Sequence, residues 1–237
     1  MSARRLGYIR GGVSKPGRGR GRGRGGSTKV ASILNSSYSP DLLPIIVPFV
    51  RGFNHEKKDG NCGYRAVALQ VYDNEKEWSK VRSECILELT QHPALYDRIL
   101  VGVDVHTLIH KISHFGDGRV PEFNWMSLPE LGHFIVTRFN VVFVSYGLHG
   151  GIICLPAAVK PGNGPPTSMV VLGHVQVGTH FLLDIDFPIH SPTLYWEAHH
   201  DQSADNLIAP YRARMDHYNT IMNAQRNYLI GNNMLSS

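Results

Sequence analysis

Residues 59–65, Asp-Gly-Asn-Cys-Gly-Tyr-Arg, place a cysteine between turn-forming residues and the start of an apolar-periodic segment. Residues 62–72 (CGYRAVALQVY) predict a helix, because their apolar residues recur at helical spacing on one face. The Asp, Gly and Asn before that helix supply turn and cap chemistry. A thiol attacks as the thiolate, and a helix N-terminus near a protonated His lowers a thiol pKa. Cys62 is therefore a candidate nucleophile; the alternative is a buried cysteine that acts as a small hydrophobe.

The two other cysteines have the pattern of core residues. Cys85 lies in a helical apolar pattern, and Cys154 lies within the apolar run 152–155. An odd number of cysteines without regular spacing does not make a disulfide framework, which favours a reducing compartment, cytoplasm or nucleus. Because the sequence has no CxxC pair or close His/Cys cluster, we expect neither a metal site nor a cofactor.

Charge divides the chain into a basic tail and a mildly acidic remainder. Residues 1–30 hold nine of the 24 Lys and Arg residues and no acid, which leaves 15 basic against 19 acidic residues. The Gly/Arg repeat in this tail has no apolar side chain to bury, so we expect a disordered segment at 1–40. Its charge attracts nucleic-acid phosphates; a merely solubilising tail is the alternative. We expect one domain at 41–218 and a C-terminal tail at 219–237.

We expect no membrane span and no secretory signal in this sequence. The apolar stretch 42–50 is short and is interrupted by two prolines, and the N-terminus has no apolar signal core.

The pattern of the domain predicts helices first and strands later, which favours an α+β fold with a small β-sheet flanked by helices. An extended lead-in at 42–53 precedes the cysteine helix. Ser127 is the expected N-cap of the last helix before the strands. The other expected helices are 75–90, 106–115 and 128–139, and the expected strands are 141–146, 152–155, 169–175 and 181–187.

A cysteine nucleophile needs a base, and His180 has the best context among the histidines. Two strands joined by a turn around Gly178 would put His180 at the start of the second strand, at the edge of the sheet. A solvent-facing turn histidine is the alternative. His174, in mid-strand, and His133, within a helix, have the context of structural residues.

The cysteine motif resembles that of a known family. Asp-Gly-Asn-Cys at 59–62, followed by Gly-Tyr-Arg-Ala, closely resembles the nucleophile motif of ovarian-tumour (OTU) domain cysteine proteases, which are mostly deubiquitinating enzymes. The likeness covers roughly residues 45–218 and is strongest with the transposon-associated branch. Its other landmarks are the 78–100 helix, the segments 125–133, 140–142 and 179–181, and then Pro188, Pro192 and Trp196.

The resemblance implies an OTU-type papain-like fold and hydrolysis after the C-terminal glycine of ubiquitin. Cys62 would be the nucleophile and His180 the base, with ubiquitin or ubiquitinated proteins as partners. Backbone N–H groups of the loop that contains Gly60 and Asn61 would hold the oxyanion. Asp59 matches the acidic position of the catalytic set; its alternative role is to cap the helix and fix the loop.

The expected orienter of the histidine is the point at which this chain departs from many relatives. Those relatives have a polar residue shortly after the histidine, where this chain has Leu182. Asp184 lies on the same strand face as His180 and is the first candidate. A missing orienter would lower the rate. The less favoured orienters are Asp186, His199 and Asp201.

The candidate residues for ubiquitin recognition are acidic and aromatic. Glu122, Glu130 and Asp117 are candidate contacts for the basic tail of ubiquitin. Trp125 and Trp196 either line the groove that binds this tail or belong to the core.

Two other functions stay open at this point. One is a catalytically impaired, mobile-element-derived fold that binds ubiquitin, which Leu182 favours. The other is a nucleic-acid-binding protein that acts through its Arg/Gly tail.

Overall fold

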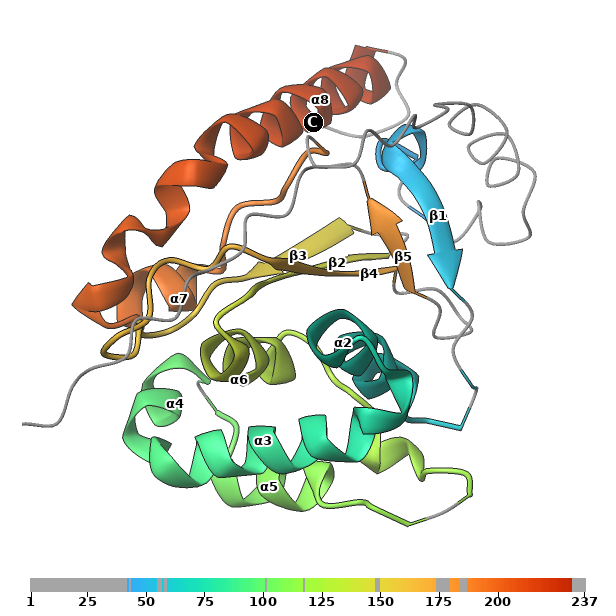
Figure 1. Ribbon diagram of the computed structural model, residues 1–237. Helices are drawn as coiled ribbons and strands as arrows, with labels where there is room; N and C mark the ends of the chain where they lie inside the picture. The colour runs from blue at the N-terminus through green and yellow to red at the C-terminus, as the bar shows by residue number, and fades with distance from the viewer. Residues whose placement is uncertain are drawn as a thin grey trace, which may run out of the picture.

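A three-stranded sheet separates two layers of helices (Figure 1). The computed structural model describes residues 42, 44–54, 57, 59–100, 102–116, 118–147, 150–173, 180–183 and 187–231. The central strand β2 (Val142–Gly147) pairs antiparallel with β3 (Gly150–Cys154) and parallel with β4 (Met169–Gly173). The sheet is therefore mixed, in the order β3-β2-β4.

Both faces of this sheet are buried, and side-chain alternation along each strand divides them between two cores. On β2, Phe143 faces one core, whereas Val142 and Val144 face the other. On β4, Val170 and Val171 divide in the same way. Because both faces are covered, the strands are apolar at almost every position, as the continuous runs in the sequence indicate.

The first core lies between the sheet and the helices on one of its faces. The helices α2 (Cys62–Tyr72) and α6 (Glu130–Phe139) contact the sheet. Further out lie α3 (Trp78–Gln91) with η3 (Glu75–Glu77), α4 (Pro93–Ile99), and α5 (Val105–Ile112) with η4 (Glu122–Asn124). Residues 131–137 of α6 are all buried, because α6 packs between the sheet and α3.

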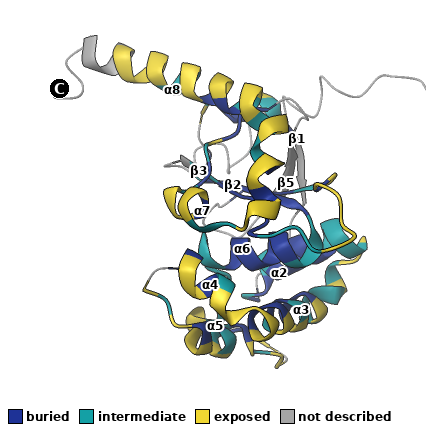
Figure 2. Cartoon of the chain, turned by 90° about the vertical axis from the view of Figure 1, so that its left-hand side faces the viewer, coloured by how far each residue is buried: buried dark blue, intermediate teal, exposed yellow. Residues whose placement is uncertain are grey.

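The second core lies between the other face of the sheet and the C-terminal elements. These are α7 (Leu194–His199), η5 (Gln202–Tyr211) and α8 (Arg212–Gly231), joined by η2 (Val47–Phe49) near the start of the domain. Figure 2 shows that much of α8 is exposed. Met215 and Tyr218 are its buried anchors.

A separate two-stranded ribbon stands beside the sheet. Strand β1 (Val50–Asn54) pairs antiparallel with β5 (His180–Leu183), and Asn54 lies opposite His180. Strand β5 also contacts β4, which in turn contacts α2. The ribbon therefore lies against β4, the same strand that the cysteine helix α2 contacts.

The predicted α+β class is confirmed, and so are the bounds of the helix at 62–72. The predicted strands at 141–146, 152–155 and 169–175 are present as β2, β3 and β4, within two residues at most bounds. The strand predicted at 181–187 begins one residue earlier, at His180, and pairs with β1. The turn predicted around Gly178 and the predicted tail 1–40 lie outside the described residues.

Several local predictions differ from the structure. The N-cap of α6 is Pro129 and not Ser127, whose carbonyl instead accepts a hydrogen bond from the Leu131 N–H at 3.1 Å. The lead-in contains a 3-10 turn before β1, since a proline is tolerated in the first turn of a helix. The 78–100 helix is present as two helices, α3 and α4, with His92 between them. Helices α7 and α8 have no counterpart in the prediction, and α8 crosses the expected domain boundary at residue 218.

Candidate active site

Cys62 is the first residue of α2 and is partly exposed. The loop before it comes from β1, so the nucleophile candidate lies where a strand passes into a helix. Cys85 and Cys154 are fully buried, which confirms their predicted place in the core. Burial raises the pKa of the Cys85 thiol, and burial with the nearby charge of Glu130 raises the pKa of Cys154 to about 12. These two thiols stay protonated at neutral pH.

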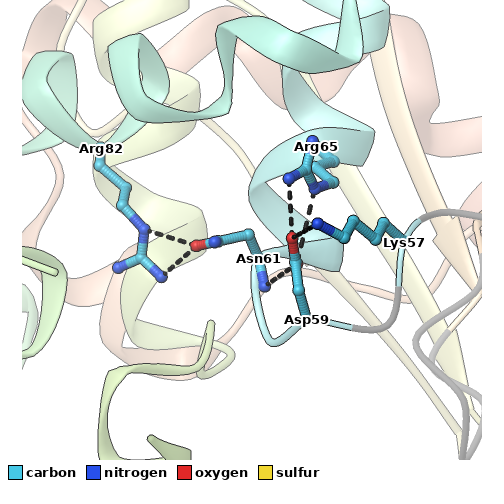
Figure 3. Close-up of polar contacts among 5 residues, drawn as sticks. All are labelled: Lys57, Asp59, Asn61, Arg65 and Arg82. Atoms are coloured by element: carbon cyan, nitrogen blue, oxygen red, sulfur yellow. Dashed lines mark hydrogen bonds and ion pairs between the residues drawn. The ribbon is translucent and has the colours of Figure 1, made fainter. Parts of the chain in front are cut away.

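Asp59 fixes the loop that precedes Cys62 (Figure 3). One carboxylate oxygen accepts a hydrogen bond from the Asn61 backbone N–H at 2.9 Å. The other accepts from Nη2 of Arg65 at 2.7 Å, and both side chains are largely buried. Lys57, with its Nζ 3.9 Å from Asp59, adds a weaker, exposed ion pair. The carboxylate therefore joins the loop to the first turn of α2.

The environment of Asp59 lowers its pKa below the ordinary value. Burial of the carboxyl raises the pKa, but the Arg65 hydrogen bond, the Asn61 N–H and the charges of Arg65 and Lys57 oppose burial and outweigh it. Asp59 is therefore an anion at neutral pH, and its two oxygens are already engaged within the loop. This arrangement favours the loop-fixing role over a role as the partner of a histidine.

Asn61 is held from the opposite side by Arg82, a residue of α3. The amide oxygen of Asn61 accepts from both Nε and Nη2 of Arg82, at 3.1 and 2.8 Å (Figure 3). Arg82 is fully buried and Asn61 is 1% exposed. Two buried guanidinium groups, those of Arg65 and Arg82, thus bind the loop from opposite sides.

This pairing changes how the N-terminus of α2 is capped. Asn61 occupies the N-cap, yet its side chain makes no capping hydrogen bond, because its oxygen faces Arg82. The N–H groups in the first turn of a helix have no partner within the helix. They are therefore not satisfied by Asn61, and such groups can hold an anion. The N–H of Asn61 itself is directed to Asp59.

Gly60 is needed for its backbone conformation and for the space around it. Its φ is +87°, and a Cβ atom there would lie 2.6 Å from Nε1 of Trp125. That Nε1 donates to the carbonyl of Val120 at 2.9 Å, and the Val120 N–H donates to the carbonyl of Asp59 at 2.8 Å. The segment 120–125 thus forms one wall of the loop.

A second contact of the same kind lies one residue beyond Cys62. A Cβ atom on Gly63 would lie 2.7 Å from the sulfur of Met126. Trp125, a candidate for either a groove or a core position, is 40% exposed beside the loop. Trp196 is in the second core, where its Nε1 donates to the Pro156 carbonyl at 3.1 Å, and is not a groove residue.

His180 is the first residue of β5, opposite Asn54, the last residue of β1. The chain then runs from Asn54 through the loop to Cys62. The fold thus brings the strand that begins with His180 beside the strand that precedes residues 59–61, the loop before the candidate nucleophile (Figure 1).

The expected orienters of His180 fall into two groups. Asp184 and Asp186 lie outside the described residues. His199 ends α7, and Asp201 accepts from the Ser203 N–H at 2.9 Å at the start of η5. Figure 1 shows α7 at the opposite end of the sheet from β5. The helix that His199 ends therefore lies away from the strand that begins with His180.

The other expected polar contacts also have definite positions. Glu122 is exposed on η4, whereas Glu130 begins α6 and has a buried Oε2 with no hydrogen-bond partner among the described atoms. Asp117 and His174 lie outside the described residues. His133 is buried, as its structural context predicts, and burial lowers its pKa to about 4.

Two residues of the site, Arg65 and Arg82, are absent from the set that the sequence analysis selected. A signal for Arg82 existed: it falls on the apolar stripe of its helix, between Val81 and Cys85, where a charged residue needs a buried partner. Arg65 is the last residue of the stretch 59–65, but the expected roles of its partner Asp59 are only capping and catalysis. Pairing between side chains six residues apart across a turn is not encoded in helical periodicity.

In the described part of the chain, no group of three or more His, Cys, Asp or Glu side chains is arranged to hold a metal ion. Among the same residues, no helix is long and apolar enough to cross a membrane.

Comparison by sequence gave no match, either to a protein-family model or to a curated protein. Comparison by structure found solved OTU domains. The viral OTU domain protease from Dera Ghazi Khan virus has a TM-score of 0.45 at 10% identity, over 58% of this chain and 83% of its own. The OTU domain of OTUD1 has a TM-score of 0.39 at 22% identity, over 55% and 82%. The viral OTU domain protease from Farallon virus has a TM-score of 0.40 at 16% identity, over 59% and 87%.

Proposed function

We propose that this protein is an OTU-like cysteine protease that hydrolyses the peptide or isopeptide bond after the C-terminal glycine of ubiquitin. The observation that carries the proposal is the position of Cys62, a partly exposed thiol at the first residue of α2, after a loop held on two sides by buried arginines. The sequence of that loop closely resembles the nucleophile motif of OTU domain cysteine proteases. The working compartment is a reducing one, cytoplasm or nucleus, since the nucleophile must stay a thiol.

In the proposed reaction His180 accepts the proton of the Cys62 thiol, and the thiolate attacks the carbonyl of the ubiquitin glycine. The C–N bond of the tetrahedral intermediate breaks, and the imidazolium returns the proton to the departing lysine amine. Water then attacks the thioester with His180 as base, which releases ubiquitin and restores the thiol. No metal or cofactor takes part.

Backbone N–H groups of the loop and the first turn of α2 hold the oxyanion in this mechanism. Each such donor commonly contributes about 3 kcal/mol to transition-state stabilisation. Since the Asn61 N–H is directed to Asp59, the donors come from the other N–H groups of this turn. We assign Asp59 to the support of the loop, and Asp184 remains the proposed orienter of His180.

The proposal is tested with ubiquitin that carries a thiol-reactive electrophile at its C-terminus. We expect a covalent adduct with the wild type, no adduct with Cys62→Ala, and a strongly slowed reaction with His180→Ala. Cys85→Ala is the matched control, because it removes a buried thiol from the neighbouring helix and should leave the adduct intact. Absence of an adduct with a folded wild type would refute the proposed protease activity.

An impaired, ubiquitin-binding descendant is the first alternative, and Leu182 favours it. In that case titration of labelled ubiquitin with the wild type would give saturable binding without an adduct.

The basic tail supports a second candidate function, which is binding of nucleic acid. Nine Lys and Arg residues without an acid fall within residues 1–30. A protein that lacks residues 1–30 should lose nucleic-acid affinity and its salt dependence and keep ubiquitin cleavage. If deletion of residues 1–30 also abolished ubiquitin cleavage, the assignment of the two functions to separate parts of the chain would be wrong.

A further inference from the structure

The guanidinium group of Arg82 is the most completely buried charge beside the nucleophile loop. Besides Asn61, it binds two backbone carbonyls: Nη1 donates to Ile112 at 2.9 Å and Nη2 donates to Asn124 at 2.9 Å. Its face lies 3.8 Å from the centre of the Tyr64 ring. All of these hydrogen-bond acceptors are neutral oxygens. Burial lowers the pKa of Arg82, and electrostatic interactions with neighbouring groups, Tyr64 first, oppose this lowering without cancelling it.

A buried cation that is satisfied only by neutral groups is a costly element of a fold. An apolar side chain in this position of α3 would pack against Tyr64 without that cost. What the guanidinium adds is geometry, because its planar fork fixes several acceptors at set angles. A buried network in which each of the three guanidinium nitrogens donates a hydrogen bond holds one arrangement of the groups around it.

The acceptors that Arg82 holds together come from three separate segments of the chain. Asn61 immediately precedes the nucleophile. Ile112 ends α5, and Asn124 ends η4, directly before Trp125, which packs on Gly60. One side chain from α3 thus ties the nucleophile loop to the wall that covers it.

We infer that Arg82 is a positioning residue for acyl transfer at Cys62, and that it acts by holding Asn61 and the turn that presents the oxyanion donors. This inference rests on the proposed function. Arg82 touches no reacting atom in this scheme. It keeps the amide oxygen of Asn61 away from the N-cap and sets the path of the backbone between Asp59 and the first turn of α2.

The test uses the full chain with Arg82→Lys, which keeps the charge and loses the fork. With ubiquitin joined to a C-terminal fluorogenic amide, we expect kcat to fall about 10- to 100-fold while KM stays within about twofold. Alkylation of Cys62 by iodoacetamide has no oxyanion, so its rate should change by less than about threefold. A merely structural role would not separate these two reactions.

Two controls make the result specific to the network. Val81→Ala, on the same helix and equally buried, lowers stability without touching Asn61 and should leave kcat within about threefold. Asn61→Ala should lower kcat in the same way as Arg82→Lys, and the double variant should fall no further than the worse single variant, because the two residues act as one unit. Asn61→Ala also carries the test if Arg82→Lys does not fold.

The inference is overturned if Arg82→Lys cleaves as Val81→Ala does, if acyl transfer and alkylation decline together, or if the two substitutions are additive. If the wild type does not cleave ubiquitin, the proposed function fails, and the same comparison is made with p-nitrophenyl acetate. That ester acylates a thiolate through an oxyanion and needs no ubiquitin site. A lower acylation rate with unchanged alkylation would then support the inference, and equal rates would overturn it.

Discussion

Asp59 and Asn61 show how two short polar residues of one turn take different roles. Asp59 is an anion paired with the Arg65 guanidinium at 2.7 Å, whereas Asn61 is a neutral acceptor for the Arg82 guanidinium at 2.8 Å. The charged pair fixes the loop to its own helix, and the neutral pair fixes it to a different helix. Asp59 and Asn61, which a motif search would select for catalysis, therefore also hold the loop in place.

Asp59→Asn should lower the free energy of unfolding by about 2 to 3 kcal/mol at neutral pH, because the largely buried Arg65 loses its anionic partner. The pKa of Asp59 is lowered from 3.8, so the contribution is fully present above pH 3.8 and is lost as pH falls through the folded-state value. Urea denaturation at a series of pH values measures both effects. Asp97→Asn, at an exposed position, is the control, and an equal loss in both variants would contradict the pairing.

His133 predicts a second pH effect at higher pH. Burial lowers its pKa from 6.5 to about 4, so between these pH values His133 is protonated in the unfolded chain and neutral in the folded protein. Stability should therefore fall by about 3 kcal/mol as pH drops from about 6.5 to about 4. His133→Leu should flatten this part of the curve, and His92→Gln, at an exposed site, should leave it unchanged. A thermal-unfolding series that keeps the same slope in His133→Leu would refute the assignment.

At the scale of elements, the start of α2 is held by the segment between α5 and α6 as much as by its own sequence. Trp125 covers Gly60, Met126 covers Gly63, and the Val120 N–H binds the Asp59 carbonyl. A strand-to-helix turn with a left-handed glycine is a local feature. Its packing against residues about 60 positions later is not.

Two glycines with nearly equal φ angles separate the cost of that packing from the cost of the backbone conformation. Gly60 has φ +87° with Trp125 2.6 Å from a built Cβ, and Gly162 has φ +86° with nothing within 4 Å. Gly162→Ala should cost about 1 to 2 kcal/mol from the left-handed backbone alone. Gly60→Ala should cost about 1 to 3 kcal/mol more, because the ring of Trp125 must move. Chemical denaturation compares them, and equal losses would show that Trp125 gives way freely.

At the scale of the whole molecule, one sheet serves two cores. Cys85 and Cys154 lie in the first core, on α3 and β3, whereas Cys62 lies at its margin. Helices α2 and α6 connect the sheet to α3, so the first core is continuous from the outer helices to the strands. The nucleophile loop lies at the margin of that continuous unit.

Thiol labelling should therefore separate the three cysteines. In the native protein iodoacetamide should modify Cys62 alone, and Cys85 and Cys154 should react together, at the rate of global unfolding, since both are fully buried in one core. Peptide mass spectrometry after timed labelling in increasing urea follows each site. Early reaction of either buried thiol would mean that the first core opens in parts.

The sequence by itself determined the helix at 62–72, the positions of the central strands, the α+β class and the buried place of two cysteines. These follow from periodicity, chain-local turn chemistry and hydrophobicity, which act over a few residues. The helices α7 and α8 were not predicted, because the partners of their buried side chains are supplied by the second core.

Only the tertiary structure decided how the candidate site is held. The pairing of Asn54 with His180, the capture of Asn61 by Arg82 and the cover of Gly60 by Trp125 join residues 126, 21 and 65 positions apart. Such contacts depend on which faces of distant elements meet, and local periodicity carries no information about that. The sequence named the nucleophile candidate, and long-range packing of buried side chains determined the shape of the loop that presents it.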